Sequence, residues 1–231
     1  MKKFATTALS LLILGAVSLA HAAPVVVDAG TYTLTYDSSF LGFAPTVSVS
    51  GDAVSFSGGT MSVNAVGNDD QSASFALDSY NGNPFPILLS AKAGYKIAGL
   101  SETLSGSYDV DVSVGSVQSG AGFVSYWVSG GVVQGNSGFK LLADTTSSSV
   151  NGDYAASSAF SFASPTQLAS LSAISLAAFA KTTGDGVAFV SANKYSLNVQ
   201  TTAVPEPETV ALMLAGLGVV GLRISRNRRA C

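Results

Sequence analysis

Five carboxylate side chains are the residues in this sequence best suited to acid–base chemistry. A pair of carboxylates on either side of a glycosidic bond can hydrolyse it, one as the acid and the other as base or nucleophile. The candidates are Glu102, Asp109, Asp111, Asp78 and Asp153. We expect Glu102 and Asp109 to lie on neighbouring strands. The simpler interpretation is that these are solvated strand residues with no catalytic role.

Acidic residues could also bind calcium. Asp109 and Asp111 are two positions apart, so in a strand they share one face, and Asn68-Asp69-Asp70 forms a cluster in a turn. Calcium requires six to eight oxygen ligands, and neither group has the spacing of an EF-hand loop. The sequence therefore predicts no metal site and no cofactor.

The histidine and cysteine content excludes several enzyme classes. His21 and Cys231 are the only residues of these types, and both lie in the end segments. The region between them thus lacks a Ser-His-Asp triad, a Cys-His pair and any imidazole metal ligand. It also has no phosphate-binding loop and no dinucleotide fingerprint. We expect the protein not to be an enzyme.

An aromatic run, residues 123–128, contains the single tryptophan. In a strand, Phe123 and Trp127 would share one face, and Tyr126 would take the other. Tyr126 and Trp127 are candidate contacts for a glycan, because aromatic rings that stand out of a sheet can stack on sugar rings. The alternative is that one face packs into the core.

The N-terminal segment has the three parts of a secretory signal peptide. Lys2 and Lys3 precede an apolar run at 8–19, which is too short for an ordinary spanning helix. Ala20-His21-Ala22 supplies the small-x-small cleavage pattern. The sequence predicts export, with signal peptidase removing residues 1–22.

The C-terminal segment combines a rigid motif, an apolar stretch and a basic end. Pro205-Glu206-Pro207 must be extended, because proline fixes φ and disfavours a helical residue before it. Residues 209–224 are predicted to form a transmembrane helix. Four arginines follow it, and they predict a cytoplasmic end: Arg223, Arg226, Arg228 and Arg229. The rest of the chain would then lie outside, in agreement with the signal peptide.

Together these three features resemble the PEP-CTERM sorting domain, over residues 204–231. The resemblance implies a Gram-negative host that makes exopolysaccharide, and recognition by an exosortase that cuts at or near Pro205-Glu206-Pro207. The chain would pass through the inner membrane as an intermediate and end at the cell envelope surface or in the extracellular matrix. Its role would be structural or interactive, in association with exopolysaccharide or biofilm. The alternatives are a carbohydrate-binding module or, less favoured, an Asp/Glu glycan hydrolase.

The region between the two end segments, 23–203, has the size of one domain. Five lysines and twelve carboxylates give it a formal charge of −7, with no arginine. Nucleic-acid binding needs basic contacts to phosphates, so no nucleic-acid partner is predicted.

Alternating apolar and polar residues run through this region, as in Tyr32, Leu34 and Tyr36 or Tyr195, Leu197 and Val199. This period of two is typical of strands with one buried face. Glycine- and asparagine-rich turns separate the runs, and the pattern predicts many short strands in an all-β antiparallel β-sandwich. The predicted turns lie at 51–52, 58–59, 67–70, 81–84, 130–131, 151–152 and 184–186. Residues 164–174 are predicted to form a short helix that begins at Ser164-Pro165. The same stretch also fits a strand, because Ile174, Leu176 and Phe179 lie close together in the sequence. Residues 201–203 are expected to be a linker to the tail.

Overall fold

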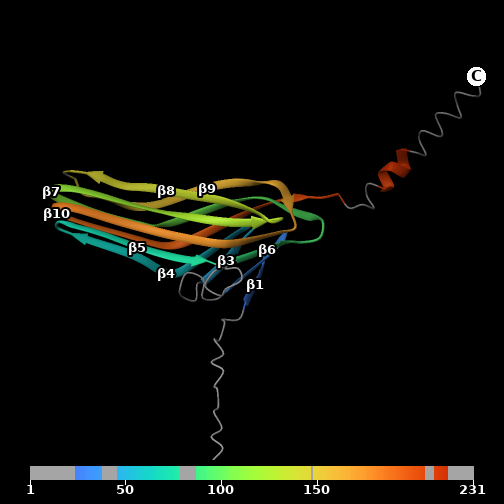
Figure 1. The fold of residues 1–231 in the computed structure, drawn as a ribbon, viewed down its shortest axis with the longest axis horizontal. Helices are drawn as coiled ribbons and strands as arrows, with labels where there is room; N and C mark the ends of the chain where they lie inside the picture. Colours follow the sequence, from blue (N-terminus) through green and yellow to red (C-terminus); the bar gives the residue numbers. More distant parts are fainter. Residues whose placement is uncertain (1–23, 38–45, 79–86, 147, 206–210, 218–231) are drawn as a thin grey trace, which may run out of the picture.

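The protein is almost entirely antiparallel β-sheet (Figure 1). The computed structural model describes residues 24–37, 46–78, 87–146, 148–205 and 211–217. Its strands are β1 (Pro24–Asp28), β2 (Tyr32–Asp37), β3 (Thr46–Ser50), β4 (Ala53–Val66), β5 (Asp69–Asp78), β6 (Ile87–Ala91), β7 (Tyr95–Ser129), β8 (Val132–Thr145), β9 (Val150–Thr166) and β10 (Leu168–Ala203). The prediction of an all-β antiparallel fold is confirmed.

Two very long strands form the centre of the sheet. β7 has 35 residues and β10 has 36, and they pair with each other along nearly their whole length. The other edge of β10 pairs in turn with β6, β5 and β4, and the other edge of β7 pairs with β9 and β8. The prediction of short strands throughout is therefore wrong for β7 and β10, because their alternation continues through positions that looked like turns.

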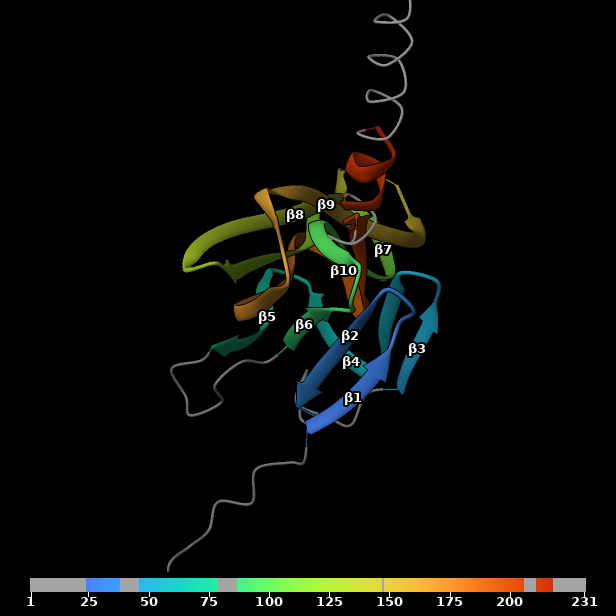
Figure 2. The same cartoon turned by 90° about the vertical axis from the view of Figure 1, so that its right-hand side faces the viewer.

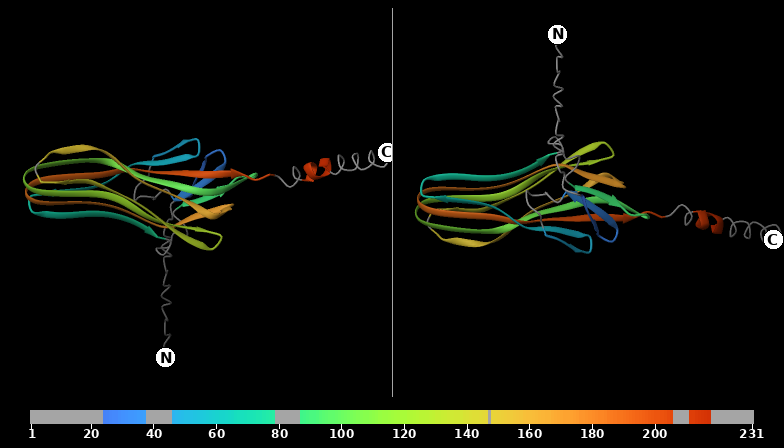
Figure 3. Two further views of the ribbon diagram at one scale, coloured as in Figure 1. Left: turned by 90° about the horizontal axis from the view of Figure 1, so that it is seen from above. Right: turned by 90° about the horizontal axis from the view of Figure 1, so that it is seen from below.

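The long strands fold over so that one sheet makes two layers. The Ser125 hydroxyl donates a hydrogen bond to Glu102, although both residues belong to β7 and lie 23 positions apart. Halfway between them is the bend, next to Gly115, which pairs with Gly184 of β10. Both glycines have positive φ, and a Cβ on Gly115 would lie 1.7 Å from the Thr183 carbonyl oxygen. Only glycine fits this bend, and Figure 3 shows the ribbons turning back there.

The strands distribute between the layers on either side of the bend. The first layer contains β3, β4, residues 186–203 of β10, residues 95–114 of β7, and β9. The second layer contains β5, residues 168–183 of β10, residues 116–129 of β7, and β8. It continues through β6 to β2 and β1. In Figure 2 these N-terminal strands lie at the end opposite to the bend.

The side chains of the core between the layers become smaller toward the bend. Near the bend it consists of alanines, valines and one tyrosine, with Val117, Ala178 and Val190 as examples. At the open end it contains larger side chains, and the rings of Phe123 and Tyr195 meet edge to face across the layers at 6.3 Å. Small side chains near the bend allow the two layers to pack closely there without voids.

The predicted helix at 164–174 is wrong. Pro165 lies near the end of β9, where the register with β7 is irregular between Gly99 and Ile97, so its missing N–H disrupts no regular ladder. Leu168 and the residues after it begin β10, which pairs with β6 and β7 on its two sides. Pairing on both edges, with Leu171 buried, overrides the local helix signal.

Several predicted turns can be compared with the structure. Turns do lie at 51–52, 67–68 and 130–131. Gly58, Gly152 and Gly184 instead lie inside strands, and the first and last of these have positive φ. The turn at 81–84 lies outside the described residues. The predicted linker at 201–203 is the end of β10, where Thr201, Thr202 and Ala203 pair with β7.

Candidate functional site

The sorting tail begins where the last strand ends. β10 ends at Ala203, and the Val204 N–H donates the next hydrogen bond, at 2.8 Å, to the Gly94 carbonyl. Pro205 follows it and is exposed. The first residue of the Pro-Glu-Pro motif is therefore held beside a rigid strand end and open to solvent. Glu206 and Pro207 lie outside the described residues.

A short helix of apolar residues, 211–217, lies beyond the end of β10 (Figure 1). Leu212 and Met213 are 73% and 68% exposed. Of the residues described, no helix is long and apolar enough to span a membrane. The rest of the predicted transmembrane helix lies outside that description. The same is true of Ala20, Ala22 and the signal peptide, and of Arg223, Arg226, Arg228 and Arg229.

The candidate carboxylate Glu102 is fully buried between the layers. Its Oε2 accepts hydrogen bonds from the Ser125 hydroxyl at 2.6 Å and from the Asn136 side-chain amide at 2.5 Å. Its Oε1 accepts one from the Tyr195 hydroxyl. The Ser158 hydroxyl in turn donates to the Asn136 Oδ1 at 2.6 Å. These five residues, the Glu102 network, join both layers.

Three donors converge on an acceptor that has no access to water. A carboxylate only accepts hydrogen bonds, and burying one is costly unless donors surround it. Burial raises the pKa of the Tyr195 hydroxyl well above its usual range, and the adjacent Glu102 carboxylate raises it further. The Tyr195 proton therefore stays in place as a donor to Glu102. The arrangement is suited to joining the layers, and a buried Glu102 cannot reach a polysaccharide.

The predicted pairing of Glu102 with Asp109 does not occur. Both lie on β7 rather than on neighbouring strands, and their odd separation of seven residues directs them to opposite faces. The interpretation of Glu102 as a solvated residue is also wrong, whereas Asp109 and Asp153 are exposed. For Asp78 the structure describes only the backbone, at the end of β5.

The Asp109 and Asp111 side chains share an exposed face, as expected, and Asp111 accepts a hydrogen bond from the Ser149 hydroxyl at 2.5 Å. In the described part of the chain, no three His, Cys, Asp or Glu side chains gather into a group that could hold a metal ion. Asp69 and Asp70 lie at the start of β5, and Asp70 pairs with Lys181 at 3.3 Å.

The two candidate glycan contacts fall on opposite sides of the second layer. Tyr126 is 47% exposed on the outer face. Trp127 points inward and is fully buried, so its proposed contact with a glycan is wrong. The alternation at 123–128 placed these residues on different faces, and Trp127 shares the core face with Phe123. Core packing is the role of this tryptophan.

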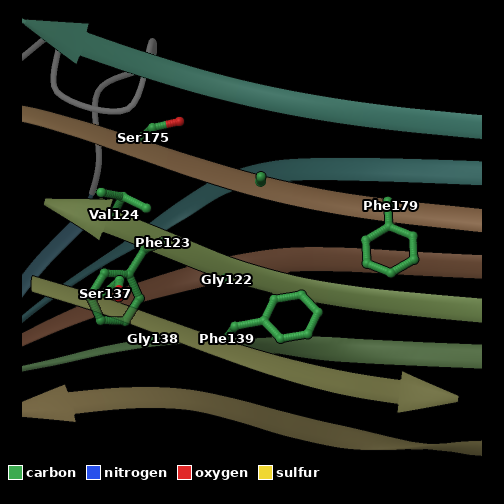
Figure 4. Close-up of a pocket in the computed structure, with 9 residues that line it drawn as sticks. Gly122, Phe123, Val124, Ser137, Gly138, Phe139, Ser175 and Phe179 are labelled. Atoms are coloured by element: carbon green, nitrogen blue, oxygen red, sulfur yellow. The ribbon is translucent and has the colours of Figure 1, made fainter.

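Two phenylalanines on the outer face of the second layer were missed by the sequence analysis. Phe139 of β8 and Phe179 of β10 lie on either side of β7, with ring centroids 6.2 Å apart and planes within 2° of parallel. Phe139 is 62% exposed. Figure 4 shows the two rings near each other at the strand that carries Gly122. Of the two rings, Phe139 is largely exposed and Phe179 is half-buried.

Two glycines of β7 make room for these rings. Gly120 pairs with Phe179, and Gly122 pairs with Phe139. A Cβ on Gly120 would lie 2.6 Å from the Phe179 ring and 2.8 Å from the Phe139 ring. We name these four residues the aromatic platform. The signal available in the sequence was Gly120-Ala121-Gly122, since two glycines on one face of a strand often mark a close approach.

A shallow cavity of about 350 Å³ lies at the aromatic platform (Figure 4). Its lining includes both phenylalanines, Val124, and the polar residues Ser137 and Ser175, and none of its lining residues is charged. The size is at the lower end of the range of small-ligand sites. Aromatic faces beside hydroxyl groups can bind a neutral ligand that has both apolar and hydroxyl-bearing surfaces.

Comparison with known protein families supports the assignment of the tail. The PEP-CTERM protein-sorting motif matches residues 203–229. This chain carries a PEP-CTERM sorting motif. The motif marks it as an exported protein that an exosortase sorts through the membrane to the cell envelope. The matched segment begins at Ala203, the last residue of β10.

The rest of the chain has only distant likenesses. No curated protein matches it in sequence. A structure of infectious bursal disease virus, Gt strain, is 14% identical over 74% of this chain, with a TM-score of 0.27, and the chain spans 40% of it. The Eiger TNF from S. frugiperda is 9% identical, with coverage of 67% and 95% and a TM-score of 0.27. A mutant of the carbohydrate-binding module CBM29-2 is 12% identical, with coverage of 77% and 93% and a TM-score of 0.17. At these scores the likenesses carry no argument about function.

Proposed function

We propose that the protein is a non-catalytic component of the cell surface or extracellular matrix, freed from its membrane tail by an exosortase that cuts at Pro205-Glu206-Pro207. The main support is the sorting motif at 203–229, which starts where the hydrogen-bonded sheet stops. Pro205 is exposed directly after that end, so an enzyme can approach the motif while the sheet remains folded. The proposal includes a signal peptidase, a transient inner-membrane stage and a place near exopolysaccharide.

The burial of Glu102 supports a non-catalytic role. A general acid or base must come within hydrogen-bond distance of its substrate, and the Glu102 carboxylate is enclosed by three protein donors. If the purified chain released reducing sugar from a polysaccharide, and Asp109→Asn abolished that release, the non-catalytic role would be refuted.

Intact mass and cell fractionation test the processing. We compare the wild type with a variant that has alanine at Pro205, Glu206 and Pro207, and with Thr202→Ala as the matched control. Thr202 is exposed three residues before the motif. We expect the wild type and the control to start near Ala23, to end near Pro207 and to leave the inner membrane. The triple variant should stay there with its arginines attached.

A wild-type product that keeps its arginine tail in the inner membrane would contradict the proposal. The protein would then be anchored by its C-terminal segment without processing. Equal processing of the triple variant would also contradict it, because the cut would then lie outside the Pro-Glu-Pro motif.

A further inference from the structure

We propose that the aromatic platform, Phe139 and Phe179 over Gly120 and Gly122, is a binding site for a neutral polysaccharide whose pyranose rings present a flat face of C–H groups. This deepens the proposed association with exopolysaccharide, on which its biological meaning rests. The binding itself depends only on the outer face of the second layer. The aromatic platform takes the place of Trp127, which is buried, as the proposed aromatic contact for sugar.

The first argument is the geometry of the two rings. They are parallel within 2° and come from strands on either side of β7. One face of a pyranose ring is lined by C–H groups, which are apolar and slightly positive. It thus complements the negative face of an aromatic ring. Two parallel rings can receive two parts of one extended chain.

The second argument is that the fold holds the rings in place. The two rings occupy the space that a side chain at Gly120 would otherwise fill. A Cβ on Gly122 would lie 2.5 Å from the Gly138 carbonyl oxygen and 3.1 Å from the Phe139 ring. Both strands that carry the phenylalanines pair with β7 across the platform, with Phe179 opposite Gly120 and Phe139 opposite Gly122 in the register. A site that is arranged before binding loses less entropy on binding.

The third argument is the chemistry around the rings. Ser137 and Ser175 supply hydroxyl groups that can exchange hydrogen bonds with sugar hydroxyls, and Val124 extends the apolar surface. No charged residue lines the cavity, so nothing there would attract an anionic polymer. Tyr126, 47% exposed, lies two positions beyond Val124 on the same face and continues the surface toward the end of β7.

The shape and lining of the site fit a sugar chain. The site is a shallow cavity of about 350 Å³ around two rings and two serines. A cavity of this size fits a short length of a linear sugar chain.

Native affinity electrophoresis of the purified full chain, in a non-ionic detergent, tests the proposal. The neutral probes in the gel are hydroxyethyl cellulose, xylan and dextran, and alginate is the anionic probe. We expect at least one neutral probe to retard the wild type and alginate to have no such effect. Phe139→Ala should weaken this retardation about tenfold, the effect of losing one aromatic contact of about 1.4 kcal/mol.

Two further variants separate ring geometry from stability. Gly120→Ala keeps both phenylalanines but places a methyl group against their rings, so it should also weaken retardation. Phe189→Ala removes an aromatic ring that is 39% exposed on the outer face of the first layer, and it should bind like the wild type. Circular dichroism confirms that each variant is folded.

The proposal is overturned if no neutral probe retards the wild type, or if Phe139→Ala and Phe189→Ala bind equally. It is also overturned if sedimentation shows a dimer that Phe139→Ala dissociates, since the platform would then contact a second copy. The chain with alanine at Pro205, Glu206 and Pro207 should bind sugar like the wild type. A failure of sugar binding is thereby separate from a failure of sorting.

Discussion

Glu102 and Phe139 lie on opposite sides of one folded sheet. The glutamate is buried, as a phenylalanine usually is, and the phenylalanine is exposed, as a glutamate usually is. Glu102 is fully buried in the interior, whereas Phe139 is 62% exposed on the outer face. Glu102 is tolerated inside because three donors satisfy it. The Phe139 ring packs on one side against Phe179 and leaves its other surface in water. The comparison teaches that the buried carboxylate has a complete structural explanation, whereas the exposed ring is the residue for which we propose a partner.

Replacement of Glu102 should give the largest effect on stability. In Glu102→Ala, the donors from Ser125, Asn136 and Tyr195 lose their acceptor inside the core. We expect a loss of about 3 kcal/mol or more in the free energy of unfolding, because buried donors without partners are costly. Urea denaturation measures it, and Asp109→Ala, on the same strand but exposed, is the control, with a change within about 0.5 kcal/mol.

Equal losses in Glu102→Ala and Asp109→Ala would break the comparison. The interior carboxylate would then contribute no more than an exposed one, and its three hydrogen bonds would have no structural role.

Tyr195→Phe should have an intermediate effect and one that depends on pH. At neutral pH it removes one donor to Glu102 and should cost about 1.5–3 kcal/mol. In the folded wild type, burial and the adjacent Glu102 carboxylate raise the pKa of Tyr195 well above the usual tyrosine value of about 10. The unfolded chain therefore loses this proton first as pH rises through about 10, and stability falls from there.

Denaturation curves between pH 8 and pH 11 check this second prediction. Tyr195→Phe should lose less stability than the wild type over that interval. Tyr154→Phe is the comparison, because burial raises the pKa of Tyr154 to about 12 although its hydroxyl has no hydrogen-bond partner within the described structure. Tyr154→Phe should reduce the loss of stability between pH 8 and pH 11 without lowering stability at neutral pH. If both variants lose as much as the wild type, the alkaline loss has another origin.

Removal of the Phe139 ring should have the smallest effect on stability. The ring is mostly in water and packs on one side against Phe179, so Phe139→Ala should lower the free energy of unfolding by about 1 kcal/mol or less. The same urea titration measures it. A loss comparable to that of Glu102→Ala would show that Phe139 has a packing role, and would weaken the case for a partner at the platform.

The period of two was enough to predict the antiparallel strands and the buried faces of Tyr32, Leu34 and Tyr195. It did not reveal the bend, because Gly115 is a single glycine in a regular run and Gly184-Asp185-Gly186 has the pattern of an ordinary turn. The role of Gly115 and Gly184 depends on their pairing across 69 residues. The same limit applies to Glu102, whose donors come from three different strands. Local patterns cannot show a contact that only the folded-over sheet creates.

The candidate sites differ in the same way, because one is a local sequence pattern and the other is created only by the folded sheet. The sorting motif is a continuous string, so the sequence was sufficient to predict it. The aromatic platform joins residues near 120, 139 and 179 and became visible only with the register of three strands. Trp127 attracted attention by its rarity, but its alternation with Tyr126 already allowed the core position that it takes.

The path of β10 also determines how the protein would respond to a mechanical load. The sorting tail continues directly from this strand, which is bonded to β7 on one side and to β4, β5 and β6 on the other. A pull on the tail would act along β10 and load these hydrogen bonds together in shear, since they run across the strand direction. The tail is thus joined to the middle of the sheet, where traction is shared by many bonds, rather than to an edge that would unzip one bond at a time.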